Sequence, residues 1–287
     1  MAGDSTTETH QAETAGASPA VFTDVLCAVD GSPGGYAAVE QAAALTGPDG
    51  HMTLLAVTSF RSAGAARSPA IAPVRMKEIL DRAVAIAESA GVHTTVEVDP
   101  AFPPAHVILE WAAEHDLLAM GAPTTPWPAG MFGGGPTAAA VGSLITPLLA
   151  ARSFPSLDSV GGPIVVASDG LVGSDRLVEF ATRLGHAGGS SVHLLHAAGH
   201  RSAKRRERIA EQARTLERTL GDSSSVKIAS GNARAIITDT ARELNAHLVV
   251  MSSRRLHGPL AIGSVSRQVV HKAACSVLLV PHEHLQA

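Results

Sequence analysis

The sequence predicts an α/β fold made of two doubly wound parallel-sheet modules in tandem, and three observations support this. The chain has 287 residues, and domains usually run to about 100–200 residues, so two domains are expected. Hydrophobic residues make up 45% of the chain and aromatic residues only 3%, so the cores must consist of Ala, Val, Leu and Ile. Strand-like and helix-like stretches alternate, and their order occurs twice, which indicates βαβ units.

Each copy begins with a short apolar strand that runs into an Asp-Gly pair. The first copy has this pattern at 25–30, and the second copy repeats it at 164–169, which is 139 residues later. A helical stretch and a second strand follow in both copies. We predict the helices at 35–45 and 175–184, and the second strands at 52–57 and 192–197.

The next helix of each copy shows the apolar spacing of an amphipathic helix. In the second copy, at 206–220, the apolar stripe is Ile209, Ala213, Leu216 and Leu220. The corresponding helix of the first copy is predicted at 75–90. The elements that follow are third strands at 92–98 and 226–229, short helices at 105–114 and 233–244, and fourth strands at 117–120 and 248–251.

Each copy then has an irregular loop, a Gly-Ser pair and a predicted last helix. The pairs are Gly142-Ser143 and Gly263-Ser264. In the second copy the helix leads to a clear strand at 276–280, whereas the first copy offers only a poor strand at 153–160, after a helix with a proline at 147 in its first turns.

The predicted domain limits follow from this repeat. We expect a disordered tail at 1–20, a first module at 21–160 and a second module at 161–287, with a Gly- and Pro-containing linker near 159–163.

Composition and charge exclude several classes of function. The net charge is −4, which favours neither a nucleic-acid nor a membrane-surface partner. No apolar run approaches the ~20 residues that span a bilayer, and the polar N-terminus lacks signal-peptide features. Cys27 and Cys275 lie in apolar stretches, and two cysteines favour core packing in a reducing compartment. The histidines show no metal-ligand spacing. We therefore expect a cytoplasmic protein without a metal site.

In a doubly wound sheet, ligands bind beyond the carboxyl ends of the strands. Asp30 and Asp169 come directly after the first strands, where a carboxylate could accept hydrogen bonds from a ribose hydroxyl or an adenine amino group. The alternative is a turn or helix-cap aspartate, because Asp-Gly is a strong turn dipeptide. The two Gly-Ser pairs would place a helix N-terminus at a phosphate, or would be ordinary serine caps.

Several motifs together extend over nearly the whole chain. They are a strand that ends in Asp-Gly-Ser, Met-Gly after the fourth strand, Gly-Ser-Val-Ser before the last helix, and Ala-Cys-Ser-Val-Leu-Leu-Val-Pro at 274–281. In these motifs the chain resembles the universal stress protein family, as two copies. The resemblance implies flavodoxin-like modules that pair through their last strands, and many members bind ATP or AMP through a Gly-x2-Gly-x9-Gly-Ser/Thr signature.

Carried over position by position, the resemblance implies a nucleotide site in each copy. The first site would consist of Ala28, Asp30, Val57, Met120, Gly121, Gly142 and Ser143. The second would consist of Ala167, Asp169, Ala197, Met251, Ser252, Gly263, Ser264, Val265 and Ser266. The ligand would be ATP or AMP, and Mg²⁺ would accompany ATP.

Both copies depart from the signature. In the second copy, Ser252 and Arg255 replace the first two glycines, and the loop to Gly263 is two residues shorter than the pattern. In the first copy Gly121 is kept, Thr124 replaces the second glycine, and the loop to Gly142 is eight residues longer. Side chains at the former glycines would block the backbone from the phosphates, whereas an arginine would supply charge to them.

Two functions from different classes fit these features. One is a stress-response regulatory protein that binds adenine nucleotide in at least one module, without catalytic residues. The other is a degenerate pair of modules that binds no nucleotide and acts as a scaffold for an unknown protein partner, with the Pro- and Gly-rich loop at 123–136 as a contact surface or a lid. The resemblance also implies pairing of the modules within the chain and leaves a homodimer open.

Overall fold

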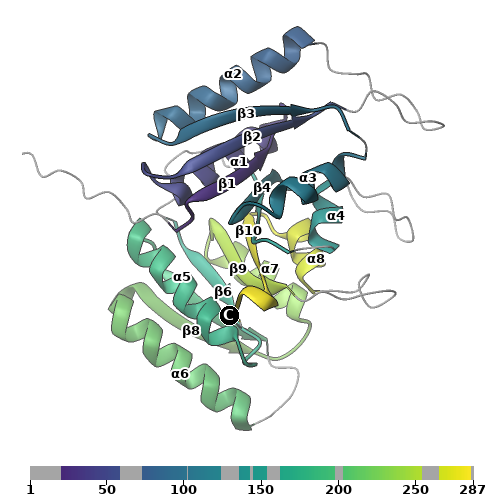
Figure 1. The fold of residues 1–287 in the computed structure, drawn as a ribbon. Helices are drawn as coiled ribbons and strands as arrows, with labels where there is room; N and C mark the ends of the chain where they lie inside the picture. The colour runs from purple at the N-terminus through teal and green to yellow at the C-terminus, as the bar shows by residue number, and fades with distance from the viewer. Residues whose placement is uncertain are drawn as a thin grey trace, which may run out of the picture.

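The computed structural model describes residues 21–58, 73–101, 103–123, 136–142, 145–153, 162–197, 203–253 and 265–285. The predicted tail at 1–20, most of the loop at 123–136 and Arg255 lie outside these residues. Figure 1 shows both modules, with the first in purple to teal and the second in green to yellow.

Both modules contain five strands and four helices in the described residues. Module 1 consists of β1 (Asp24–Ala28), α1 (Pro33–Thr46), β2 (His51–Val57), α2 (Pro73–Ser89), β3 (His93–Asp99), α3 (Pro104–Ala112), β4 (Leu117–Gly121), α4 (Pro136–Gly142) and β5 (Leu148–Ala151). Module 2 consists of β6 (Ile164–Ala167), α5 (Ser174–Gly188), β7 (Val192–Ala197), α6 (Ala203–Leu220), β8 (Ser224–Ala229), α7 (Ala233–Glu243), β9 (Leu248–Ser253), α8 (Val265–Lys272) and β10 (Ser276–Pro281).

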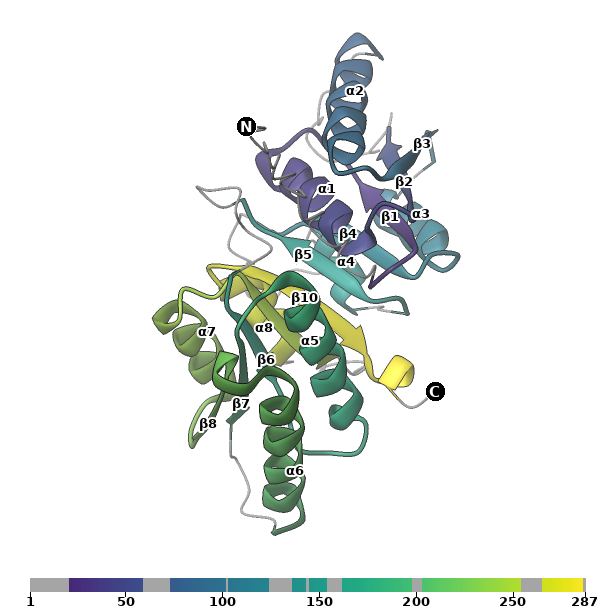
Figure 2. The same ribbon diagram turned by 90° about the vertical axis from the view of Figure 1, so that its left-hand side faces the viewer.

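The strands form one ten-stranded sheet in the order β3-β2-β1-β4-β5-β10-β9-β6-β7-β8. Within each module all pairs are parallel, as the βαβ pattern predicts. The two modules meet where β5 pairs antiparallel with β10, with Leu149 opposite Leu278. The order of the second half mirrors that of the first, so the modules pair through their last strands as expected (Figure 2).

Helices cover both faces of the sheet and enclose two cores. The first core receives side chains from α1, α2, α5 and α6, and the second from α3, α4, α7 and α8. The apolar spacing of α6 places Ile209 and Leu216 in the first core, with 1% and 0% of their surface exposed. Cys27 and Cys275 are free thiols buried in these cores. Burial raises the pKa of the Cys275 thiol to about 11, so both cysteines act as small apolar side chains.

The end of module 1 differs from the prediction. The described residues show no helix between Gly142, where α4 ends, and Leu148, where β5 begins. The last strand is Leu148–Ala151, whereas the sequence offers only a poor strand at 153–160, and 154–160 lie outside the described residues. A proline disrupts a helix interior because it lacks a hydrogen-bond donor, so Pro147 disfavours the predicted helix. In the structure Pro147 directly precedes β5, in which all four residues are buried. In module 2, β10 includes Pro281 and does not end before it.

A polar network joins the modules at the seam between β5 and β10. Ser276 Oγ donates to Gln41 Oε1 at 2.6 Å, and the Arg152 backbone N–H donates to Ser276 Oγ at 3.0 Å. The Arg152 guanidinium donates to the carbonyl oxygens of Val270 and His271 at 3.0 and 3.1 Å, at the end of α8. Module 1 thus supplies donors to the C-terminal carbonyls of a module 2 helix, which fixes that helix against the seam.

Candidate functional site

The carboxyl ends of three module 2 strands line a cleft of about 240 Å³. It receives Ala167 from β6, Ala197 from β7, and Met251 and Ser252 from β9, all of which the sequence predicts as site residues. The complete lining is Ala167, Ser168, Asp169, Leu195, Ala197, Ala233, Ile237, Met251, Ser252, Val265 and Ser266. The small side chains at the ends of β6 and β7 leave the space that a larger residue would fill.

Asp169 lies at this cleft and also closes a turn. Its Oδ1 accepts a hydrogen bond from the Leu171 N–H at 2.9 Å. In module 1 the Asp30 Oδ1 accepts in the same way from the Ser32 N–H at 2.9 Å. The turn interpretation is therefore confirmed for both aspartates. Asp169 is half-buried, whereas Asp30 is exposed, so the two carboxylates have different access to solvent.

Two helices of module 2 begin at the cleft. Ala233 is the first residue of α7 and Val265 the first residue of α8, and both line the cleft. The cap residue of α7, Asn232, accepts a hydrogen bond from the Ala235 N–H at 3.1 Å. Helix starts carry N–H groups without intrahelical partners and the positive end of the helix dipole, so this arrangement favours an anionic group. Gly263 and Ser264 lie outside the described residues.

The predicted residues of module 1 also lie at the carboxyl ends of its strands. Ala28 ends β1, Val57 ends β2, and Met120 and Gly121 end β4. Here β4 and the start of α1 are in close contact, since a Cβ added at Gly121 would lie 2.9 Å from the Gly34 carbonyl carbon. Gly121 therefore serves backbone packing.

The helix starts of module 1 differ from those of module 2. Both α3 and α4 begin with a proline, Pro104 and Pro136, and Pro103 caps α3 without a side-chain hydrogen bond. Proline has no backbone N–H, so these positions cannot donate to an anion. Thr137 Oγ1, in the first turn of α4, donates to the Gly121 carbonyl oxygen at 2.9 Å.

Strand register corrects the assignment of the module 1 Gly-Ser pair. Met120 lies opposite Ala150, and Met251 lies opposite Leu279. Pro136 precedes Ala150 by 150 − 136 = 14 residues, and Val265 precedes Leu279 by 279 − 265 = 14.

The counterpart of Gly263-Ser264 is therefore Gly134-Gly135, and the choice of Gly142-Ser143 was wrong. Gly142 ends α4, while Ser143 lies outside the described residues. Gly121 and Gly134 have the spacing of the first and third glycines in Gly-x2-Gly-x9-Gly. Counted to Gly134 and not to Gly142, the loop of the first copy therefore has the length of the signature.

Sequence reasoning missed four residues of the cleft. They are Ser168, Leu195, Ala233 and Ile237. An asparagine directly before a helical pattern indicates a helix start. Asn232 could therefore have identified Ala233 as the first residue of a helix at the strand ends.

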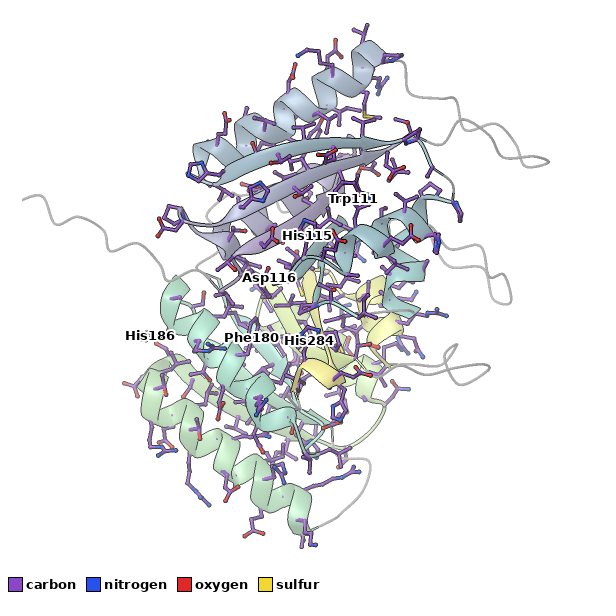
Figure 3. All side chains as sticks on the ribbon, viewed as in Figure 1. Trp111, His115, Asp116, Phe180, His186 and His284 are labelled. Atoms are coloured by element: carbon purple, nitrogen blue, oxygen red, sulfur yellow. The ribbon has the colours of Figure 1, made fainter. Side chains whose placement is uncertain are left out.

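Larger hollows lie elsewhere in the described structure. One of about 770 Å³ lies between α5 and α6 and is lined mostly by charged and polar residues. Another of about 800 Å³ lies along the seam, where Asp116 of module 1 and Phe180 and His284 of module 2 lie together (Figure 3). Neither receives the predicted site residues. Among the described residues no three His, Cys, Asp or Glu side chains are grouped for a metal ion. No described helix is both long and apolar enough to cross a bilayer.

The fold and the cleft define a tandem α/β protein with a cleft at the strand ends of module 2. The model of the universal stress protein family matches twice, at residues 22–152 and 162–281. The chain therefore belongs to the universal stress protein family, as a member with two modules. A comparison with curated proteins finds no significant match.

Solved structures share the arrangement of both modules. A universal stress protein from Archaeoglobus fulgidus DSM 4304 matches with a TM-score of 0.71 and 19% identity, over 91% of this chain and 97% of that chain. A universal stress protein described as putative, from Pseudomonas aeruginosa UCBPP-PA14, has a TM-score of 0.65 and 18% identity, over 92% and 96%. At these identities the likeness concerns the fold. A universal stress protein in complex with cAMP matches only 43% of this chain, with 21% identity and a TM-score of 0.36.

Proposed function

We propose that this chain is a stress-response regulatory protein of the cytoplasm that binds an adenine nucleotide, ATP or AMP, in the module 2 cleft. The observation that carries the proposal is the convergence of seven sequence-predicted residues on one cleft, together with two helix starts. The proposal includes no catalytic step. Regulation would come from the difference between the free and the nucleotide-bound chain.

The dimensions of the cleft assign parts of the nucleotide to its walls. A volume of about 240 Å³ lies below the roughly 300–1,000 Å³ of pockets that enclose drug-sized ligands. The base and ribose would fill it, with the base against Ala197 and Ile237 and a ribose hydroxyl on Asp169. The phosphates would extend toward the starts of α7 and α8, where the positive end of each helix dipole favours negative charge.

Mg²⁺ would enter with ATP. Among the described residues that line the cleft, Asp169 is the single carboxylate. Mg²⁺ is commonly bound by one or two carboxylates, nucleotide phosphates and water. The residues present therefore fit an ion held chiefly by the nucleotide, which neutralises phosphate charge.

Calorimetric titration with ATP and AMP tests the proposal, with a matched pair of variants. In Asp169→Asn the amide oxygen still accepts from the Leu171 N–H, so the turn is kept while the charge is removed. We expect ATP affinity to fall about tenfold or more, as for loss of a charge-assisted hydrogen bond. Asp30→Asn, the same change in module 1, should change it less than twofold.

The opposite outcomes are informative. Absence of heat with both nucleotides overturns nucleotide binding. That result would favour the scaffold function. Ser252 supports this alternative, because its side chain lies in the cleft at a position where the signature has glycine. A larger loss in Asp30→Asn than in Asp169→Asn would move the site to module 1.

A further inference from the structure

A buried polar network lies behind Asp169 in module 2. Its centre is Gln212 of α6, a side chain that is 3% exposed. Gln212 Oε1 accepts from Ser168 Oγ at 2.7 Å. Gln212 Nε2 donates to Ser174 Oγ at 2.9 Å and to Asp175 Oδ1 at 2.7 Å. Burial of an amide is costly unless its donors and acceptors are paired, and here both ends of the amide are paired.

The network holds both ends of the turn that carries Asp169. Ser168 directly precedes the aspartate, whereas Ser174 and Asp175 begin α5 after the turn. Ser168 is also held by its backbone, since His196 Nδ1 donates to its carbonyl oxygen at 2.9 Å. The Gly170 N–H donates to Ser168 Oγ at 3.2 Å. The position of the Asp169 carboxylate therefore depends on a residue whose other contacts lead to Gln212.

A salt bridge extends the network to the surface. Arg208, one turn before Gln212 on α6, pairs with Asp175. The carboxylate of Asp175 thus accepts from both an amide and a guanidinium of the same helix. As a result, α6 contacts the start of α5 through paired groups at two successive turns.

Module 1 lacks this network at the corresponding positions. Ile79 of α2 and Ile209 of α6 both lie against the glycine that follows the aspartate, Gly31 and Gly170. Three residues further along, Gln212 corresponds to Arg82. The counterparts of Ser168, Ser174 and Asp175 are Val29, Gly35 and Tyr36. Arg82 lies over the half-buried Tyr36 ring, 4.2 Å from its centre, so module 1 replaces the hydrogen bonds with a contact between a guanidinium and a ring.

From this difference we infer that Gln212 is a positioning residue for Asp169. Gln212 holds the Asp169 carboxylate in the geometry that binds the ribose of the nucleotide. The inference rests on the proposed function of the module 2 cleft. Gln212 does not line that cleft. It acts through Ser168, and preorganisation of a ligand-binding group reduces the ordering cost of binding.

The test is calorimetric titration of ATP into the full chain carrying Gln212→Met, a change that keeps the length of the side chain and removes its hydrogen bonds. We expect about fivefold weaker binding, the equivalent of one net hydrogen bond. Backbone amide exchange measured by NMR should become faster at Gly170 and Leu171, while amides of module 1 remain unchanged.

A second variant separates positioning from stability. Ser168→Val with Gln212→Met removes both partners of the Ser168–Gln212 hydrogen bond and copies the valine of module 1, so neither side chain is left unpaired. The Gly170 N–H also loses Ser168 Oγ as its acceptor, so recovery of stability should be partial. The thermal midpoint without ligand should recover toward that of the wild type, while ATP affinity stays reduced. Arg82→Met, the equivalent change in module 1, should leave ATP affinity unchanged.

Three results overturn the inference. An unchanged dissociation constant in Gln212→Met, with normal binding by the wild type, shows a purely structural glutamine and leaves the proposed function intact. Recovery of affinity together with stability in the double variant shows the same. No binding by the wild type overturns the proposed function and, with it, the role of Gln212.

Discussion

In module 2 the helices beside the strand ends begin with Ala233 and Val265, whereas those of module 1 begin with Pro104 and Pro136. The two modules share a fold and a strand order, and this difference lies at the edge where doubly wound sheets carry their ligands. Module 2 keeps backbone donors there, while module 1 keeps the glycine of the family signature. A shared fold therefore does not give the two edges the same chemistry.

The use of glycine shows the same contrast. Gly121 ends β4 of module 1 in contact with the start of α1, and its counterpart in module 2 is Ser252. In module 1 the absence of a side chain serves packing, and in module 2 a side chain is tolerated at the cleft. Loss of a signature glycine at this position is thus compatible with the fold of module 2.

The largest expected effect comes from exchanging these two residues. Gly121→Ser would place a Cβ 2.9 Å from the Gly34 carbonyl carbon and 3.0 Å from the Gly35 nitrogen. Such overpacking against backbone should lower the free energy of unfolding by about 2–3 kcal/mol. The reverse change, Ser252→Gly, should lower it by about 0.5–1 kcal/mol. Urea unfolding of both variants measures the difference, and equal losses would contradict the contrast between the modules.

A smaller effect is expected when a module 1 feature is copied into module 2. Ala233→Pro removes the first N–H of α7, and the extended backbone of Asn232 suits a residue before proline. Proline is tolerated at this helix position, so the thermal midpoint without ligand should hardly change.

Nucleotide titrations then measure the loss of the N–H group in Ala233→Pro. Affinity for ATP should fall about threefold, as for one weak hydrogen bond, while affinity for adenosine stays the same. An equal loss for adenosine would place the phosphates elsewhere.

The smallest effect concerns acid sensitivity. Burial lowers the pKa of His193 and His271, and the charges of Lys272 and Arg152 lower that of His271 further. Below about pH 6.5 the unfolded chain therefore binds more protons than the folded chain. The contribution of these two histidines to the free energy of unfolding is complete above that pH. It is lost as the pH drops toward their pKa values in the folded chain.

Thermal midpoints at pH 7.5 and 5.5 measure this dependence. His271→Gln, which stays neutral, should show a smaller drop on acidification than the wild type. His93→Gln, at an exposed histidine of module 1, provides the control. If both variants lose as much as the wild type, His271 does not contribute to the acid sensitivity.

Periodicity predicted most of the fold because each copy repeats the same order of apolar stripes. It failed at the end of module 1, where β5 is only four residues long and half of it is alanine. Alanine is depleted in strands, and what places this segment is its pairing with β4 and β10. Such long-range pairing has no local signal in the sequence.

The strand ends were predictable because parallel strands carry their ligands at one edge. Gln212 was not, since a polar residue among Ile209, Ala213 and Leu216 suggests an exposed position. In the structure it is buried because three partners satisfy its amide, Ser168 of the connecting turn and Ser174 and Asp175 at the start of α5.

Photoaffinity labelling with an ATP analogue that carries an azide on the adenine ring tests the central claim most directly. Proteolysis and mass spectrometry of the labelled chain identify the attached peptide. The module 2 site predicts label within residues 162–285, competed by unlabelled ATP and lost in Asp169→Asn. Competed label confined to residues 21–123 would contradict it and assign the nucleotide to module 1.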